Sequence, residues 1–353
     1  MKIIFWQNII SPHQISLLSE LNKKCEILLI YQKQTEEYRE KMGWEKESPK
    51  SFNILSCAEF NELSLFERNK ILDSSFHIFS GINAYKELKP HFRYLYKKKP
   101  ESLYIYMEKP DSKIFSNLVS LFRFIKYCFY SFKFKKIKKI ITPGGKDYFT
   151  KAFWSANVVA DFAYYGPKTL ADKNLKLHDK DIVKLLYVGE LSNRKNLYMF
   201  LQTLLQSKNR NWQLEIIGEG EEEDALRKLC KANYSSSKNI KFLKYLRNET
   251  VLKKMKMVDY VVLPSKHDGW GYVVNEAFSV GAGVIASKNC GVSSLSNFCE
   301  NFHTFQSKSD LTKILANLCA SGPLKGKQKK KNLEFYNNFL RPAEGVKKLM
   351  NIL

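Results

Sequence analysis

Residues 261–291 read VVLPSKHDGWGYVVNEAFSVGAGVIASKNCG, and this stretch decides the fold of the second half of the chain. The apolar run that ends at Pro264 predicts a buried strand. A polar loop with glycines follows, then a helix over 272–280 and a second apolar strand over 284–286. Strand, glycine-rich loop, helix and strand in this order predict a parallel α/β sheet, whose ligands lie beyond the carboxyl ends of its strands.

The loop between that strand and helix has the composition of a site for a polar ligand. Gly269 and Gly271 let backbone N–H groups approach a ligand closely, and the N-terminus of the following helix favours anions. Seven residues separate Asp268 in the loop from Glu276 on the first turns of the helix. A carboxylate accepts two hydrogen bonds from a vicinal diol, so both acids suit sugar or ribose hydroxyls. A generic α/β loop with a capping acid is the alternative.

A second loop of the same kind lies upstream, in the stretch YVGELSNRKNL at 187–197. It follows a predicted strand at 182–188 and precedes a helix expected from about residue 195. Gly189 permits close backbone approach, and Arg194 and Lys195 stand at the start of the helix. Two cations with oriented N–H groups suit a diphosphate, although a basic pair at a helix start is more often plain surface.

These two motifs, in this order, resemble the donor site of retaining glycosyltransferases of family 4, which have the GT-B fold. PSKHDGWGYVVNEA is similar to the family's signature of an acidic residue, seven positions and a glutamate. The 187–197 loop is similar to the one that holds the donor's pyrophosphate, and Gly218 belongs to a turn similar to the family's second glycine-rich turn. The resemblance covers residues 183–291 and is to enzymes that build bacterial capsules, O-antigens and exopolysaccharides.

The resemblance implies a reaction and a set of roles. A sugar would move from a nucleotide sugar, expected to be a UDP-sugar, to a glycan or lipid-linked acceptor with retention of configuration, in surface polysaccharide biosynthesis. Catalytic roles fall on Arg194, Lys195, Asp268 and Glu276. Glu276 would hold the ribose, and Asp268 with the loop N–H groups would position the transferred sugar. Donor contacts are implied for Gly189, Arg194, Lys195, Gly218, Gly269, Trp270, Gly271, Tyr272 and Glu276.

The expected chemistry needs no cofactor and no metal. No Asp-x-Asp triplet stands where it would hold a divalent ion. No carboxylate nucleophile is evident either, and the front-face displacement proposed for the resembled family requires none. The nucleotide-diphosphate sugar is then a substrate, and the leaving diphosphate would be stabilised by the fixed cations and helix N–H groups.

The first half of the chain predicts another doubly wound domain. Segments of helix length alternate with short apolar strands, at 2–6, 25–31, 51–55, 76–79 and 103–107. His13 follows the first of these strands and Glu108 the last, where this architecture presents ligand contacts. We expect both on the acceptor side of the site. A helix-start histidine without a ligand and a solvated loop acid are the alternatives.

The 353 residues are enough for two domains of ordinary size. The resembled fold has two Rossmann-like domains that face an interdomain cleft, with a C-terminal helix packed back on the first. On that pattern we expect an acceptor-binding domain over 1–165, a linker over 166–180, a nucleotide-sugar domain over 181–335, and the returning helix over 336–353.

The net charge of +23 is concentrated in two stretches. Residues 86–139 hold 15 Lys/Arg against 4 Asp/Glu, and residues 325–353 hold 8 against 2. Clustered positive charge attracts nucleic acid or an anionic membrane. The chain has no helix-turn-helix, zinc or RNA-binding motif, so we do not expect a nucleic acid partner. An anionic membrane surface contacted through residues 86–139 is the partner that this charge favours.

Within the basic stretch, residues 115–132 are apolar and aromatic apart from Arg123 and Lys126. The segment is too short and too charged for a transmembrane helix and predicts an amphipathic one. A core helix with its lysines outside and a membrane-facing helix are compatible interpretations.

Seven cysteines without a C-x2-C pair predict reduced thiols and a cytoplasmic protein, either free or peripheral on the inner face of the cytoplasmic membrane. Other function classes stay open. A catalytically inactive GT-B scaffold is suggested by the absence of a glycine pair in the first loop and of a glycine after Leu243. The charge suggests a nucleic-acid-binding protein. A phosphorylase or nucleotide-sugar epimerase on the same fold is the other enzyme class.

Overall fold

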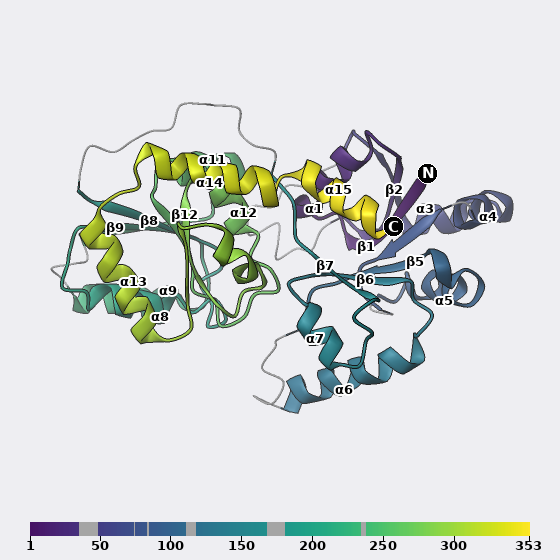
Figure 1. Cartoon of the computed structure of the whole chain (residues 1–353), viewed down its shortest axis with the longest axis horizontal. Helices are drawn as coiled ribbons and strands as arrows, with labels where there is room; N and C mark the ends of the chain where they lie inside the picture. Colours follow the sequence, from purple (N-terminus) through teal and green to yellow (C-terminus); the bar gives the residue numbers. More distant parts are fainter. Residues whose placement is uncertain (35–48, 74, 83–84, 111–117, 168–180, 234–237) are drawn as a thin grey trace. The chain divides into compact units, whose positions relative to one another are not determined.

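The structure is a computed structural model that describes residues 1–34, 49–73, 75–82, 85–110, 118–167, 181–233 and 238–353. The chain divides into two compact units, each built around one parallel sheet (Figure 1). The first unit comprises Met1–Tyr165 and Pro342–Leu353, and the second comprises Gly166–Arg341. Residues 168–180 of the expected linker lie outside the described residues.

The first unit holds a sheet of seven parallel strands in the order β3-β2-β1-β4-β5-β6-β7. The strands are β1 Lys2–Ile9, β2 Glu26–Lys33, β3 Asn53–Ser56, β4 Phe76–Phe79, β5 Leu103–Tyr106, β6 Lys139–Pro143 and β7 Val159–Phe162. The helices are α1 Pro12–Leu21, α3 Cys57–Glu62, α4 Leu65–Asp73, α5 Lys89–Lys98, the short η1 Pro100–Ser102, α6 Leu118–Lys133, α7 Lys146–Lys151 and α15 Pro342–Ile352. The order of the strands reverses between β1 and β4.

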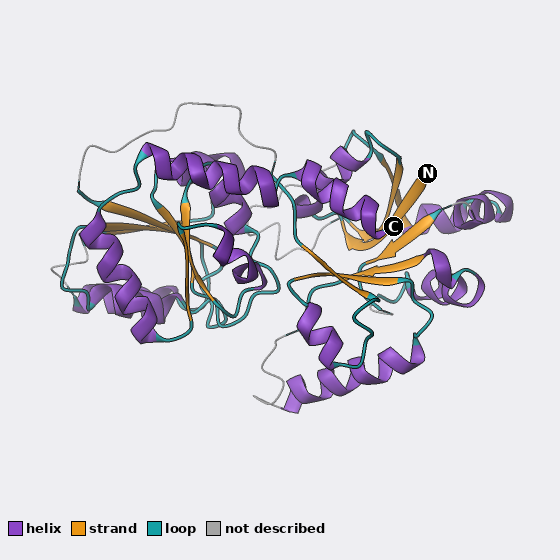
Figure 2. Ribbon diagram, viewed as in Figure 1, coloured by secondary structure: helices purple, strands orange, loops and turns teal. Residues whose placement is uncertain are grey.

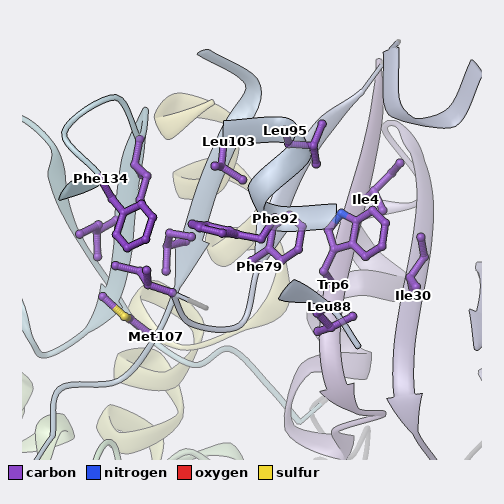
Figure 3. Close-up of a cluster of buried hydrophobic side chains, with 14 of the residues drawn as sticks. Ile4, Trp6, Ile30, Phe79, Leu88, Phe92, Leu95, Leu103, Met107 and Phe134 are labelled. Carbon is purple, nitrogen blue, oxygen red and sulfur yellow. The ribbon is translucent and has the colours of Figure 1, made fainter. Parts of the chain in front are cut away.

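The period-two alternation of β1 gives this sheet its two buried faces. Ile4 and Trp6 belong to a cluster of buried hydrophobic side chains, part of which Figure 3 shows. The Trp6 ring stacks on Phe79 with ring centroids 5.1 Å apart. Phe5 points to the other face, where it lies beside Leu17 of α1 and Leu349 of α15. Helices therefore cover the sheet on both sides, as Figure 2 shows.

The last helix of the chain belongs to the first unit. Helix α15 packs against α1 and β7. Gly345 makes this approach possible, since a Cβ there would lie 2.4 Å from Tyr165 Cγ and 2.8 Å from Leu17 Cδ1. The expected return of the C-terminal helix to the first domain is confirmed. The helix begins at Pro342 rather than at residue 336, because the preceding residues continue another helix as far as Phe339.

The second unit holds six parallel strands in the order β10-β9-β8-β11-β12-β13. The strands are β8 Val183–Val188, β9 Trp212–Ile217, β10 Ile240–Leu243, β11 Tyr260–Leu263, β12 Gly283–Ser287 and β13 Phe302–Phe305. The helices are α8 Leu197–Leu205, α9 Glu223–Ala232, α11 Asn248–Lys256, α12 Val273–Ser279, the 3-10 segment η2 Gly291–Phe298, α13 Lys308–Ser321 and α14 Gly326–Phe339. Helices α8, α9 and α13 pack together, as do α11, α12 and α14, and the two groups cover opposite faces of the sheet (Figure 1).

Two doubly wound parallel sheets are the fold that the sequence predicted, but some element boundaries were wrong. The helix expected from residue 195 begins at Leu197, because Asn196 takes a left-handed conformation with φ of 57° and ends the turn before it. Helix α11 begins at Asn248, and Arg247 occupies its N-cap position. None of the seven cysteines, all of which lie in the described residues, takes part in a disulfide.

Candidate functional site

The candidate site lies where the strand order of the second sheet reverses. Strands β8 and β11 are neighbours and run parallel, with Tyr187 beside Val262. The loop after β8 leads to α8 on one face of the sheet, and the loop after β11 leads to α12 on the opposite face. The two loops therefore lie side by side at the carboxyl edge and then part. In open α/β sheets this is where ligands bind. The two loops are the ones that the sequence singled out, at 189–196 and 264–272.

Direct hydrogen bonds hold these two loops together. The backbone N–H of Lys266 donates to the carbonyl of Arg194 at 2.9 Å. The side chain of Asn196 donates to the carbonyl of Pro264 at 3.2 Å. Asn196 tolerates the left-handed conformation that turns its side chain to this task. Arg194 and Lys195 therefore stand in a turn that is tied to the neighbouring loop, just before α8.

The cations of the first loop surround the acid of the second. Lys195 Nζ lies 2.6 Å from Asp268 Oδ2, and both side chains are 17% exposed. Arg194, which is half exposed, lies 3.8 Å from Asp268 Oδ2 and 3.8 Å from Glu190 Oε2. Its guanidinium also donates to the carbonyl of His267 at 3.4 Å. Asp268 is thus held between two cations at the carboxyl edge of β8.

The glycines after β8 and β9 permit close contact between the two turns. Gly189 and Gly218 have φ of +152° and +146°, conformations that side chains rarely adopt. A Cβ on Gly218 would lie 1.9 Å from the carbonyl oxygen of Gly189. Gly220 is similarly confined, because a Cβ added to it would lie 2.4 Å from the carbonyl oxygen of Leu191. Gly218 therefore has a structural reason to be glycine, namely the packing of one turn on the other.

The loop after β11 is fixed by its own side chains. Trp270 is buried, and its indole Nε1 donates to Asn275 Oδ1 at 2.9 Å. Gly271 has φ of +101° and packs against Leu263. Among the described residues, the backbone N–H groups of Gly269 and Gly271 have no hydrogen-bond acceptor. The indole thus serves the loop's packing, and what this part of the loop offers a ligand is backbone N–H.

Glu276 lies on α12, behind the loop, and is buried. Burial raises the pKa of its carboxyl to about 7, although a hydrogen bond from Asn248 opposes the shift. Asn248 Nδ2 donates to Glu276 Oε1 at 2.9 Å. Sequence reasoning missed this contact. Its position after β10, at the same edge of the sheet, was the signal that would have indicated it.

The acceptor-side candidates lie in the first unit. His13 is in the first turn of α1, just beyond β1, and Glu108 follows β5 by two residues. Strand β4 lies between β1 and β5, so both residues stand at the carboxyl edge of the first sheet. Their roles remain predictions. No cluster of three or more His, Cys, Asp or Glu side chains in the described part of either unit is arranged to hold a metal ion.

Residues 169–320 match the family described as "Glycosyl transferases group 1". An uncharacterized glycosyltransferase of Haemophilus influenzae is 32% identical over 167 residues, which are 46% of this chain and 44% of that protein. The aligned region thus spans less than half of that relative's length.

Solved structures match over the whole chain. The lipopolysaccharide outer core galactosyltransferase WaaB, in its apo form, has a TM-score of 0.70 at 15% identity and covers 100% of this chain and 99% of its own. HepE of Anabaena, solved in complex with UDP and glucose, has a TM-score of 0.64 at 14% identity, covering 99% and 98%. At these identities the likeness concerns the fold, and it is the GT-B fold that the sequence predicted.

Proposed function

We propose that this chain, whose second unit belongs to the glycosyl transferases group 1 family, transfers a sugar from a nucleotide-sugar donor to a glycan or lipid-linked acceptor with retention of configuration. One observation carries the proposal. At the switch point of the second sheet, Arg194 and Lys195 lie against Asp268, on loops that are hydrogen-bonded to each other. This arrangement fixes two cations at the edge where α/β sheets bind ligands.

The donor's diphosphate would bind at these two cations, Arg194 and Lys195. Arg194 offers a planar fork of donors and Lys195 a compact ammonium, and both pair well with phosphate oxygens. Negative charge grows on the diphosphate as the bond to the sugar breaks. Cations that are already in place stabilise that charge without having to reorganise, which lowers the barrier to transfer.

Glu276 would take the ribose, and Asp268 the transferred sugar. A carboxylate accepts hydrogen bonds from both hydroxyls of a vicinal diol. Asn248 fixes one oxygen of Glu276 from the side, at 2.9 Å, and so acts as a positioning residue. Asp268 is oriented by its contact with Lys195. The N–H groups of Gly269 and Gly271 complete a set of donors and acceptors that matches a hydroxyl-rich ligand.

We propose a UDP-sugar as donor and surface polysaccharide biosynthesis as pathway. HepE, which shares the fold, was solved with UDP and glucose, and WaaB is a lipopolysaccharide galactosyltransferase. The enzyme would act in the cytoplasm, on the inner face of the cytoplasmic membrane. The 15 Lys/Arg against 4 Asp/Glu of residues 86–139 supply the electrostatic attraction to that face. His13 and Glu108 are the proposed acceptor contacts.

Turnover of a panel of UDP-, GDP- and ADP-sugars, followed as release of free nucleotide without added metal, tests the proposal. One donor should be consumed by the wild type and hardly at all by Lys195→Ala. Lys331→Ala is the matched control, because Lys331 also pairs with a carboxylate, that of Glu300 at 2.9 Å, but on α14. A folded protein that consumes and binds none of the panel would favour the inactive scaffold instead.

A further inference from the structure

Helix α6 carries a row of large apolar side chains that point into solvent. Leu118, Val119, Phe122, Ile125, Phe129 and Phe132 are each 52% to 72% exposed. At 100° per residue, five of them fall within an arc of about 80° around the helix axis, and Val119 lies about 60° beyond the edge of this arc. Large apolar residues exposed singly are common, but a contiguous row of this kind marks an interaction site.

The opposite side of α6 is firmly packed, so the exposed row keeps its direction. Phe124 and Tyr127 pack against the core of the first unit. The Phe124 ring lies 5.8 Å from the Tyr148 ring, and the Tyr127 ring lies 5.5 Å from the Phe149 ring, both on α7. Figure 1 shows the two helices next to each other in this unit. The helix is anchored through one face, and its other face stays largely exposed.

Phe153 extends the row from the end of α7. Its ring is 67% exposed and its centroid lies 6.2 Å from that of Phe132. Its backbone has φ of +64°, a left-handed conformation just after the C-cap Ala152, where glycine is the usual residue. A bulky side chain in this conformation is strained. The chain thus keeps an exposed aromatic ring at a position where glycine would fit the backbone better.

The charge around this row is of one sign. Residues 118–138 contain six Lys/Arg and no Asp/Glu. Lys133 Nζ lies 5.5 Å from the centre of the Phe129 ring, so cation and aromatic ring stand together on the exposed side. Two copies of such a surface would repel each other. An apolar row flanked by cations matches the boundary between the headgroups and the acyl chains of an anionic bilayer.

We propose that α6 and Phe153 form an interfacial anchor, in which the apolar row inserts below the headgroups of an anionic membrane while the flanking cations contact lipid phosphates. The helix would lie in the plane of the membrane, since its 16 residues extend about 24 Å, less than the hydrocarbon core of about 30 Å. No helix in the described residues is long and apolar enough to cross a membrane. The anchor goes beyond electrostatic attraction and does not rest on the proposed sugar transfer.

Flotation of the full chain with vesicles of phosphatidylcholine, with and without phosphatidylglycerol, tests the anchor. At an ionic strength of about 0.15 M the wild type should bind the anionic vesicles. Phe122→Ser with Phe129→Ser should weaken this partition by about 100-fold, since each buried ring contributes about tenfold or more. Phe66→Ser on α4 is the matched control, because Phe66 is 78% exposed, and it should change nothing.

Phe153→Gly separates membrane binding from stability. Glycine relieves the left-handed conformation, so the melting temperature should stay level or rise while vesicle binding weakens several-fold. Binding that is unchanged by all the apolar substitutions and vanishes at high salt would overturn the anchor. So would a lipid-free dimer that the Phe122/Phe129 substitutions dissociate, because the occupant would then be a second copy. Lys195→Ala should bind vesicles normally, so failure of the sugar-transfer proposal would leave this result intact.

Discussion

At the switch point of the second sheet, Lys195, Arg194 and Asp268 form a charged cluster across the loops after β8 and β11. At the switch point of the first sheet, two hydrogen bonds between neutral groups join the corresponding elements. Gln7 donates to Gln14, and the hydroxyl of Ser80 donates to the carbonyl of Trp6. The same topology thus presents fixed charge in one unit and neutral hydrogen-bonding groups in the other. Topology places the ligand edge, and the side chains decide which ligand suits it; we propose a diphosphate in the second unit and neutral hydroxyls in the first.

The largest effect is expected from removing a charged side chain at the carboxyl edge of the second sheet. Lys195→Ala or Glu276→Ala should lower kcat/KM by at least about 100-fold, or about 2.7 kcal/mol of transition-state stabilisation. His13→Ala, at the carboxyl edge of the first sheet, should leave donor binding unchanged and alter only the dependence on acceptor. Steady-state kinetics with donor and acceptor varied separately distinguish these effects. Equal losses of donor affinity from both edges would contradict the division of roles.

The buried acid gives the charged edge a pH dependence. The folded-state pKa of Glu276 is raised from 4.5 to about 7, so the folded protein binds more protons than the unfolded chain in this window. The contribution of this proton to the free energy of unfolding is fully present below about pH 4.5. It is lost as the pH rises through about 7, which lowers the free energy of unfolding by at most roughly 3 kcal/mol. Urea unfolding at a series of pH values should show this loss. Glu276→Gln should abolish it, and a variant with the wild-type slope would contradict the assignment.

Close backbone contact in the two units allows a matched comparison of stability. Gly218→Ala places a Cβ 1.9 Å from a carbonyl oxygen at the charged edge, and Gly345→Ala places one 2.4 Å from the Tyr165 ring in the first unit. Each should lower the free energy of unfolding by about 2 kcal/mol through overpacking. Only Gly218→Ala should also weaken donor binding, because it separates the turns after β8 and β9. Chemical denaturation together with donor titration measures both.

The smallest expected effect concerns Asn248, which contacts Glu276 and no proposed ligand. Asn248→Ala removes the hydrogen bond that holds the pKa of Glu276 down, so the pH at which donor affinity reaches half its maximum should rise. At neutral pH the loss of affinity should be about tenfold, as expected for one hydrogen bond to a charged group. Asn248→Gln, which keeps the amide, tests for partial recovery. An unchanged pH profile would show that Asn248 serves only the packing of α11 and does not tune the pKa of Glu276.

Much of the fold and of the candidate site was predictable from local sequence. The apolar run 76–79 gave a strand with the observed bounds, because a buried parallel strand needs little beyond a short apolar segment. The two loops and their acids and cations were found because their residue types and spacing carry the chemistry. The contact of Asn248 with Glu276 was missed, since it joins residues 28 apart in sequence through the tertiary fold. Gly345 and Phe153 were missed for the same reason, because close approach and an exposed left-handed ring are not visible in a local pattern.

Calorimetric titration of a UDP-sugar at pH 7, in two buffers of different ionisation enthalpy, tests the central claim most directly. A diphosphate diester does not titrate near this pH, so any proton released comes from the protein. With the pKa of Glu276 at about 7, binding as a carboxylate should release about half a proton. The account predicts binding with this release in the wild type, and weakened binding without it in Glu276→Gln. Binding that is equally tight and releases the same proton in the variant would contradict it.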